Sequence, residues 1–147
     1  MLVEGEAFVS DQWVRLVWFG MLLLHGVGHG GAMGALAWIA ARPNTNTGSW
    51  TAAKSWLLSS MEPRTAMLVA NAFWLVSLAG FVLAAGLFFF STSDLWQPIA
   101  IASAVVSAAG IVLFFGNWPL FNTIAALAVN VVVVVALVFL RWTPPAG

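Results

Sequence analysis

The chain has 147 residues, of which 62% are hydrophobic and only 7% are charged, and its formal net charge is zero. Such a composition lies outside the soluble globular class and is typical of integral membrane proteins. Without a basic patch the chain is not expected to bind nucleic acid. The absence of cysteine excludes disulfides and thiolate metal sites.

Four apolar segments are long enough to cross a bilayer, whose hydrocarbon core of about 30 Å needs roughly 20 helical residues. They cover residues 13–40, 64–90, 95–115 and 120–142. Backbone groups in hydrocarbon must bond within their own segment, so each is expected to be a helix. Two of the connections are short, which makes neighbouring helices antiparallel. The expected fold is an all-α membrane protein: one domain (residues 1–147) forming an antiparallel bundle of four transmembrane helices.

The longest polar stretch, residues 42–62, connects the first two spans. Within it, apolar residues recur at helical spacing, at Trp50, Ala53, Leu57 and Met61. With Ser49 as its cap, this pattern predicts a short interfacial helix over residues 49–61 that lies on the membrane surface. A loop helix packed on the end of the bundle fits the pattern equally well.

Four spans predict a multi-pass protein of the cell membrane with both termini on the same side. The connection between the first two spans is flanked by Arg42, Lys54 and Arg64, whereas the other face carries Arg15 and Arg141. By the positive-inside rule, the connection is expected to be cytoplasmic, on the strength of one charge.

Glycines recur at every fourth position in the first span, at Gly26, Gly30 and Gly34. In lipid, such G-x-x-x-G steps let another helix backbone approach closely. Complementary small residues on the second and third spans are Gly80, Ala84, Ala104 and Ala108. The pattern predicts tight helix packing within the bundle, or a docking surface for a second copy or for other membrane subunits.

Both histidines of the chain, His25 and His29, lie four residues apart near the middle of the first span, and therefore on one side of the helix. The other spans carry polar residues at a similar depth, Ser77, Ser103, Ser107 and Asn130, with Asn71 somewhat shallower. An unpaired polar group facing lipid costs several kcal/mol. These side chains are therefore expected to converge on the bundle axis and to bond one another.

Three interpretations of this polar interior remain open. The histidines can form a neutral, hydrogen-bonded pair that fixes how the helices assemble. They can instead line a cavity for a hydrophobic molecule such as a quinone, lipid or pigment, since intramembrane ionisable residues are candidates for function. The aromatic wall of such a cavity would come from Phe73, Trp74, Phe81, Phe114 and Phe121.

The third interpretation is a metal or haem site at His25, His29 and Met33, because imidazole and thioether suit copper(I). Successive steps of four residues drift around a helix, so Met21 and Met33 cannot share one ion. Two histidines of one helix also cannot supply both axial ligands of a haem. No cofactor is predicted, and no catalytic constellation lies at membrane depth.

Short motifs resemble those of an uncharacterised family of small bacterial four-helix integral membrane proteins. Residues 23–29 match a Leu-x-His-Gly-x-x-His element in the first helix, and residues 78–82 match a Leu-Ala-Gly-Phe-Val element in the second. The Trp-x-Pro at residues 96–98 and the turn at residues 117–119 are also similar. The resemblance spans residues 22–140 and implies the four-helix layout with paired histidines, but no activity.

Two functions follow as hypotheses. The first is a non-catalytic membrane subunit that packs through its glycine- and alanine-rich helix faces against itself or a larger complex. The alternative is a binder of a hydrophobic molecule or cofactor (quinone, lipid, pigment, copper or haem) at the polar site around His25 and His29.

Overall fold

The computed structural model describes residues 3–42, 46–48 and 50–142, with side chains from residue 11 onward. Its helices are α1 (Val3–Ala41), α2 (Pro63–Phe90), α3 (Trp96–Leu113) and α4 (Leu120–Val134), the last continuing into a π-helix, η1 (Val135–Phe139). Four helical stretches are long and apolar enough to cross a membrane. The prediction of an all-α chain with four such helices is confirmed, and the described residues contain no strand.

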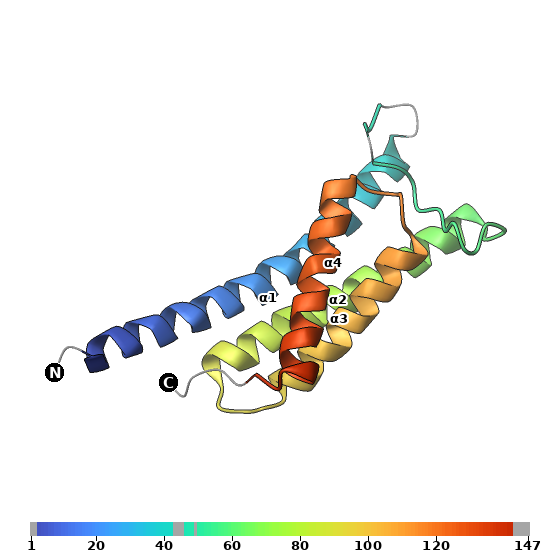
Figure 1. Ribbon diagram of the computed structural model, residues 1–147. Helices are drawn as coiled ribbons and strands as arrows, with labels where there is room; N and C mark the ends of the chain where they lie inside the picture. The colour runs from blue at the N-terminus through green and yellow to red at the C-terminus, as the bar shows by residue number, and fades with distance from the viewer. Residues whose placement is uncertain (1–2, 43–45, 49, 143–147) are drawn as a thin grey trace.

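The helices pack side by side with α2 at the centre of the contacts (Figure 1). α2 packs extensively against α1 on one side and α3 on the other, and α4 packs on α3. By comparison, α4 barely contacts α1. The N-terminal part of α1 extends past the other helices (Figure 1).

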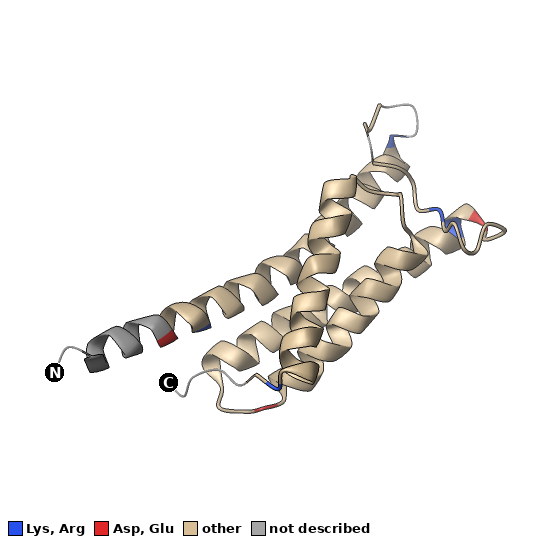
Figure 2. Ribbon diagram, in the orientation of Figure 1, with Lys and Arg blue, Asp and Glu red and all other residues tan. Residues whose placement is uncertain are grey.

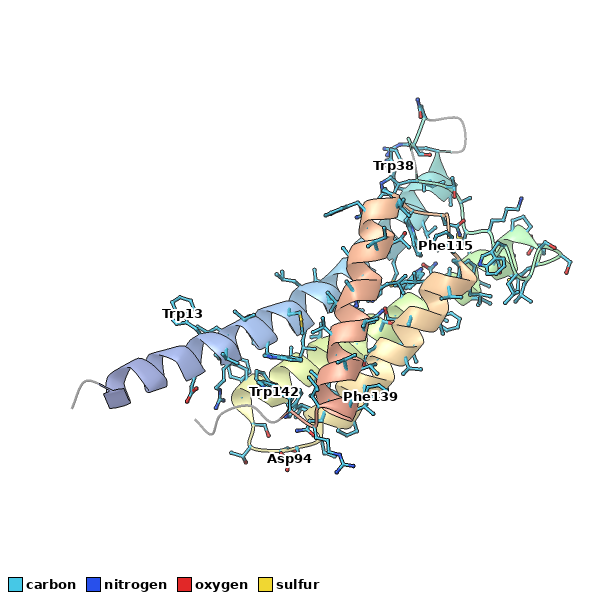
Figure 3. The ribbon with its side chains drawn as sticks, viewed as in Figure 1. Trp13, Trp38, Asp94, Phe115, Phe139 and Trp142 are labelled. Carbon is cyan, nitrogen blue, oxygen red and sulfur yellow. The ribbon has the colours of Figure 1, made fainter. Side chains whose placement is uncertain are left out.

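Charged residues occupy the two ends of the described bundle and leave its middle uncharged (Figure 2). Large aromatic side chains also lie toward the ends, with Trp38 and Phe115 at one end and Phe139 and Trp142 at the other (Figure 3). An apolar band bordered by aromatic and charged residues is the surface that a bilayer requires.

The first helix is longer than the sequence pattern predicted, since it begins at Val3 and not at Trp13. Apolarity identifies the part of a helix that suits lipid, but it does not set where the helix starts. Residues 3–12 contain no proline, and the acidic residues Glu4 and Glu6 suit the positive end of a helix dipole. Helix formation can therefore continue well beyond the apolar span.

The last helix ends earlier than predicted, at Phe139. Its final turn widens, so that the Leu140 N–H donates to the Val135 carbonyl at 2.9 Å, five residues back. Arg141 then adopts a left-handed φ of 49°, a common way to end a helix. Such a π-turn is rare, and apolar composition alone does not reveal it.

The predicted interfacial helix over residues 49–61 is wrong for residues 50–61, which contain no helix; its proposed cap, Ser49, lies outside the described residues. Hydrogen bonds join this segment to the end of α3 and to the α3–α4 turn instead. The Thr51 N–H donates to the Asn117 carbonyl (3.0 Å), and Trp56 Nε1 donates to the Val112 carbonyl (2.6 Å). Ala53 and Ser55 are buried in alternation, a spacing of two that overrides the helical pattern.

Small residues bring α1, α2 and α3 close together. A Cβ added at Gly26 would lie 3.0 Å from Phe81 Cβ, and one at Gly30 would lie 3.5 Å from Leu78. A Cβ added at Gly80 would collide with Ser103 of α3. Ala84 and Ala104 are fully buried, and Ala108 is half-buried. Gly34 is exposed and has no such neighbour within 4 Å, so only part of the glycine series packs inside the bundle.

The apolar core is divided into two clusters along the bundle. One contains Leu22 of α1, Phe81 of α2, Ala104 of α3 and Val133 of α4. The other contains Leu36 of α1, Trp74 of α2, and Ile111 and Phe114 toward the far end of α3. Each helix has polar residues between members of these two clusters: His25 and His29 on α1, Ser77 on α2, Ser107 on α3 and Asn130 on α4. The fold therefore places one polar level in the middle of an apolar bundle.

Candidate functional site

Four polar side chains from three helices form one hydrogen-bonded chain at this level. His25 Nε2 lies 2.9 Å from Asn130 Oδ1, Asn130 Nδ2 lies 2.8 Å from Ser107 Oγ, and Ser107 Oγ lies 3.0 Å from His29 Nε2. These bonds join α1 to α4, α4 to α3, and α3 back to α1. His25, His29, Ser107 and Asn130 are called the polar layer below.

The direction of these bonds follows from the donor and acceptor atoms. Asn130 Oδ1 carries no hydrogen, so His25 Nε2–H donates to it. The Asn130 amide donates to Ser107 Oγ, whose own hydrogen is then free to donate to His29 Nε2. With Ser107 donating, His29 is uncharged and carries its proton on Nδ1, and the Nε2–H bond of His25 is one that its uncharged tautomer makes. Uncharged rings suit a site at membrane depth.

Aromatic rings hold the two imidazoles in place. The Trp74 indole of α2 stacks on His29 with the ring centroids 5.3 Å apart and the planes 5° from parallel. His25 stands edge-on to His29 at 4.9 Å and to Phe81 at 4.6 Å. Because Trp74 and Phe81 are fully buried, the two imidazole rings packed against them have little freedom to turn.

The remaining polar residues predicted for this interior do not join the polar layer. Ser103 is buried, but its hydroxyl donates to the Ile99 carbonyl of its own helix at 2.7 Å. Ser77 Oγ and Asn71 Oδ1 are buried without a hydrogen-bond partner among the described residues. Depth in the membrane therefore identified the level, while helix rotation decided which side chains meet.

A pocket of about 390 Å³ adjoins the polar layer and lies between α1 and α4. Each of these helices gives it one face at helical spacing. The face of α1 consists of Met21, Leu24, His25, Gly28, His29 and Ala32. The face of α4 consists of Phe121, Asn122, Ala125, Ala126 and Val129, with Thr123 beside them. Both histidines thus belong to the wall of the pocket.

Other elements enclose the pocket on its inner side and at one end. Trp74 of α2 and Ile111 of α3 line it from inside, and Trp118 of the α3–α4 turn and Trp50 of the connection line it near the end of the bundle. On the outer side, Leu24 is 71% exposed and Phe121 is 81% exposed. The pocket therefore opens sideways, in the direction that lipid would occupy.

Two tryptophans that line the pocket, Trp74 and Trp118, have buried indole N–H groups without a hydrogen-bond partner among the described residues. An indole N–H is only a donor, and buried ones usually find an acceptor. Asn122 and Thr123 add further polar groups, whereas no Asp, Glu, Lys or Arg of the described residues lines the pocket.

The predicted aromatic wall is only partly the wall of this pocket. Trp74 and Phe121 line it, but Phe73, Phe81 and Phe114 do not. Sequence reasoning missed Trp50 and Trp118, which lie outside the spans and reach the pocket through the turn and the connection. The α1 face could have been found, because residues 21, 24, 25, 28, 29 and 32 follow the spacing of one helix side.

The residues proposed for a metal do not form one centre. Met33 packs in the apolar cluster around Trp74, and the Nε2 atoms of both His25 and His29 are engaged in hydrogen bonds. In the described part of the chain, no three His, Cys, Asp or Glu side chains come together as metal ligands. What the arrangement offers is an apolar pocket with a few hydrogen-bonding groups.

No family model, curated protein or solved structure matches the chain. The resemblance to small bacterial membrane proteins, drawn from short motifs within residues 22–140, therefore stays a prediction.

Proposed function

We propose that the protein binds a hydrophobic small molecule in the pocket between α1 and α4, within a membrane. The observation that carries this proposal is a cavity of about 390 Å³ that extends from the polar layer toward one end of the bundle and whose wall contains both histidines. Small-molecule sites are concave and mostly apolar, with a few convergent polar groups and volumes of roughly 300–1,000 Å³. The pocket has these properties, and its sideways opening suits a molecule that arrives from lipid.

The membrane arrangement is part of the proposal. The four helices cross the cell membrane as an antiparallel bundle, with both termini on one side and residues 42–62 on the cytoplasmic side. The arrangement of charges supports this orientation, since Arg42, Lys54 and Arg64 flank that connection. The uncharged middle of the bundle in Figure 2 supports the crossing itself.

The polar layer has a supporting role in this function. Its bonds fix α4 to α1 and α3 at one level, so the pocket keeps its shape although α1 and α4 have few other contacts. The same bonds satisfy the Nε2 atoms of both histidines and leave their Nδ1 atoms for other interactions. The proposed activity is binding, with no chemical step.

The test uses two glycines of α1 that differ in one respect. Gly28 and Gly34 are both exposed, and a Cβ at either would meet no described atom within 4 Å, but only Gly28 lines the pocket. The wild-type protein, Gly28→Leu and Gly34→Leu are purified gently from membranes, and their organic extracts are compared by mass spectrometry. A molecule should co-purify with the wild type and Gly34→Leu, and be lost in Gly28→Leu. Equal retention by all three proteins would refute binding in this pocket.

A second candidate function is a membrane subunit that associates through the outer face of α1. It is favoured by the open positions Gly31 and Gly34, which are exposed and pack against nothing within the bundle. In lipid, small residues on an outer face allow another helix to approach. The partner we propose is a second copy of this chain.

The same variants separate the two functions. If α1 associates with a second copy, Gly34→Leu should convert dimers into monomers in nanodisc or detergent mass measurements, while Gly28→Leu should leave them intact. A wild-type protein that is monomeric at all concentrations would exclude this second function. It would leave ligand binding unaffected.

A further inference from the structure

The walls of the α1–α4 pocket restrict the chemistry of what it can hold. We infer that the ligand has an uncharged, flat head group bearing carbonyl oxygens, as in lipid-soluble quinones, and an aliphatic tail that leaves between α1 and α4. This inference rests on the proposed function and adds the class of ligand and its path. Three features of the pocket carry it.

The first feature is charge. Among the described residues no Asp, Glu, Lys or Arg lines the pocket, and the hydrogen bonds of the polar layer suit two uncharged imidazoles. Moving an unpaired charge out of water into such surroundings is strongly unfavourable. Phospholipid head groups and fatty-acid carboxylates are therefore poor occupants, whereas a neutral head is suitable.

The second feature is the balance of donors and acceptors. Trp74 and Trp118 line the pocket, and the indole N–H of each is buried without a hydrogen-bond partner among the described residues; an indole N–H can only donate. Unmet donors favour a ligand that accepts hydrogen bonds. A carbonyl oxygen accepts without bringing a donor of its own, so a ring with carbonyls fits better than a pure hydrocarbon.

The third feature is shape. Flat rings surround the pocket: the indoles of Trp50, Trp74 and Trp118, and the imidazole of His29 stacked on Trp74. Aromatic faces favour stacked or edge-on contacts with another flat ring. The exposed side chains Leu24 and Phe121 border the opening from α1 and α4, which gives an attached tail an apolar path into lipid.

The test compares three probes of similar size on wild-type protein in nanodiscs of uncharged lipid. The probes are 2-methyl-1,4-naphthoquinone, 2-methylnaphthalene, which has the same rings without carbonyls, and dodecanoate, which is charged. The quinone should bind roughly tenfold or more tightly than the hydrocarbon, as two hydrogen bonds imply. Dodecanoate should bind weakest of the three.

The outcomes separate this inference from the proposed function. Equal binding of quinone and hydrocarbon would overturn the carbonyl head and keep the pocket as a binding site. Preference for dodecanoate would overturn the neutral head. Failure of all three probes to bind, together with no co-purifying molecule, would remove the proposed function itself.

Variants locate the donors. Trp118→Phe keeps a ring but removes the N–H, and should weaken quinone binding roughly two- to tenfold while leaving binding of 2-methylnaphthalene unchanged. Trp38→Phe, an exposed tryptophan of α1 outside the pocket, is the matched control and should change neither. A loss of affinity for both probes in Trp118→Phe would show that the ring, and not its N–H, matters.

The sideways path can be tested directly because the chain has no cysteine. A nitroxide attached at the opening through Leu24→Cys in detergent, before transfer to nanodiscs, should become less mobile when long-tailed quinone binds. The same label at Leu75→Cys of α2, which is exposed but does not line the pocket, should keep its mobility. Unchanged mobility of the label at Leu24→Cys at saturating quinone would overturn the path.

Discussion

The two sides of α1 show opposite uses of small residues. Toward α2, Gly26 lets the helices approach until an added Cβ would lie 3.0 Å from Phe81 Cβ and 3.3 Å from the Leu78 carbonyl. Toward α4, Gly28 has nothing within 4 Å of the same position and lines the pocket. Gly26 and Gly28 are only two positions apart on α1, yet one lies in a packed interface and the other beside an open pocket.

The difference shows that a small residue permits close packing but does not bring it about. On the α2 side, apolar side chains such as Phe81 fill the interface. On the α4 side, the polar layer holds the helices at one level, and its hydrogen bonds fix a spacing that leaves room beside them. A glycine series in a membrane helix is thus compatible with either structure.

Gly26→Leu should have the largest effect of the changes considered, because it attacks the packed side. The new side chain has no room between Phe81 and the backbone of α2, and overpacking of this kind costs about 3 kcal/mol. The free energy of unfolding, measured by circular dichroism during titration from mild detergent into SDS, should fall by that amount. Gly31→Leu on the open side is the control and should lose no stability. Equal losses in both variants would contradict the comparison.

Asn130→Leu should have the next largest effect, because Asn130 bonds His25 directly and reaches His29 through Ser107. The change removes two hydrogen bonds between helices and leaves His25 Nε2–H and Ser107 Oγ without these partners. We expect a loss of about 1–3 kcal/mol in the free energy of unfolding. Asn122→Leu, an exposed asparagine of the same helix, should change stability little.

A double-mutant cycle sharpens the same prediction. His25→Ala and Asn130→Leu should show a coupling energy of about 0.6–1.7 kcal/mol, the range for hydrogen bonds between membrane helices. Additive losses would mean that the 2.9 Å contact contributes nothing to holding α1 and α4 together.

Much of the fold was predictable because membrane helices follow a simple rule. Long apolar segments must satisfy their own backbone groups, so composition alone predicted four helices. The same reasoning predicted that His25, His29, Ser107 and Asn130 would turn inward, since lipid is a poor environment for them. The hydrogen bonds of the polar layer agree with that expectation.

What could not be predicted depends on contacts between distant parts of the chain. Residues 50–61 have a helical pattern, but bonds from Thr51 to Asn117 and from Trp56 to Val112 hold them in another conformation. The rotation of α3 is a second example: it turns Ser107 into the polar layer and leaves Ser103 bonded to its own helix. The opening beside Gly28 also depends on how α4 is placed, which residue spacing on α1 does not determine.

Trp56→Phe should have a smaller effect, confined to the end of the pocket. Its Nε1 donates to the Val112 carbonyl at 2.6 Å, while 60% of the side chain is exposed, so mainly one hydrogen bond is lost. We expect a loss of about 0.5–1.5 kcal/mol and faster amide hydrogen exchange at Thr51, whose N–H bonds Asn117 across the same junction. Leu57→Ala, equally exposed, is the control. Unchanged exchange at Thr51 would show that Trp56 does not hold the segment in place.

Protonation of Glu62, the exposed N-cap of α2, should have the smallest effect, restricted to the first turn of that helix. Hydrogen bonds from the backbone N–H groups of Arg64 and Thr65 hold the pKa of Glu62 below its ordinary value. A carboxyl whose pKa is lower in the folded state stabilises the fold above its unfolded pKa, and loses that contribution as the pH falls through the folded value. Amide exchange at Thr65, corrected for the intrinsic rate, should therefore become faster in acid. Glu62→Gln keeps an acceptor oxygen without the titration, so its exchange should not vary with pH over this range. Acid dependence that persists in Glu62→Gln would assign the effect to another group.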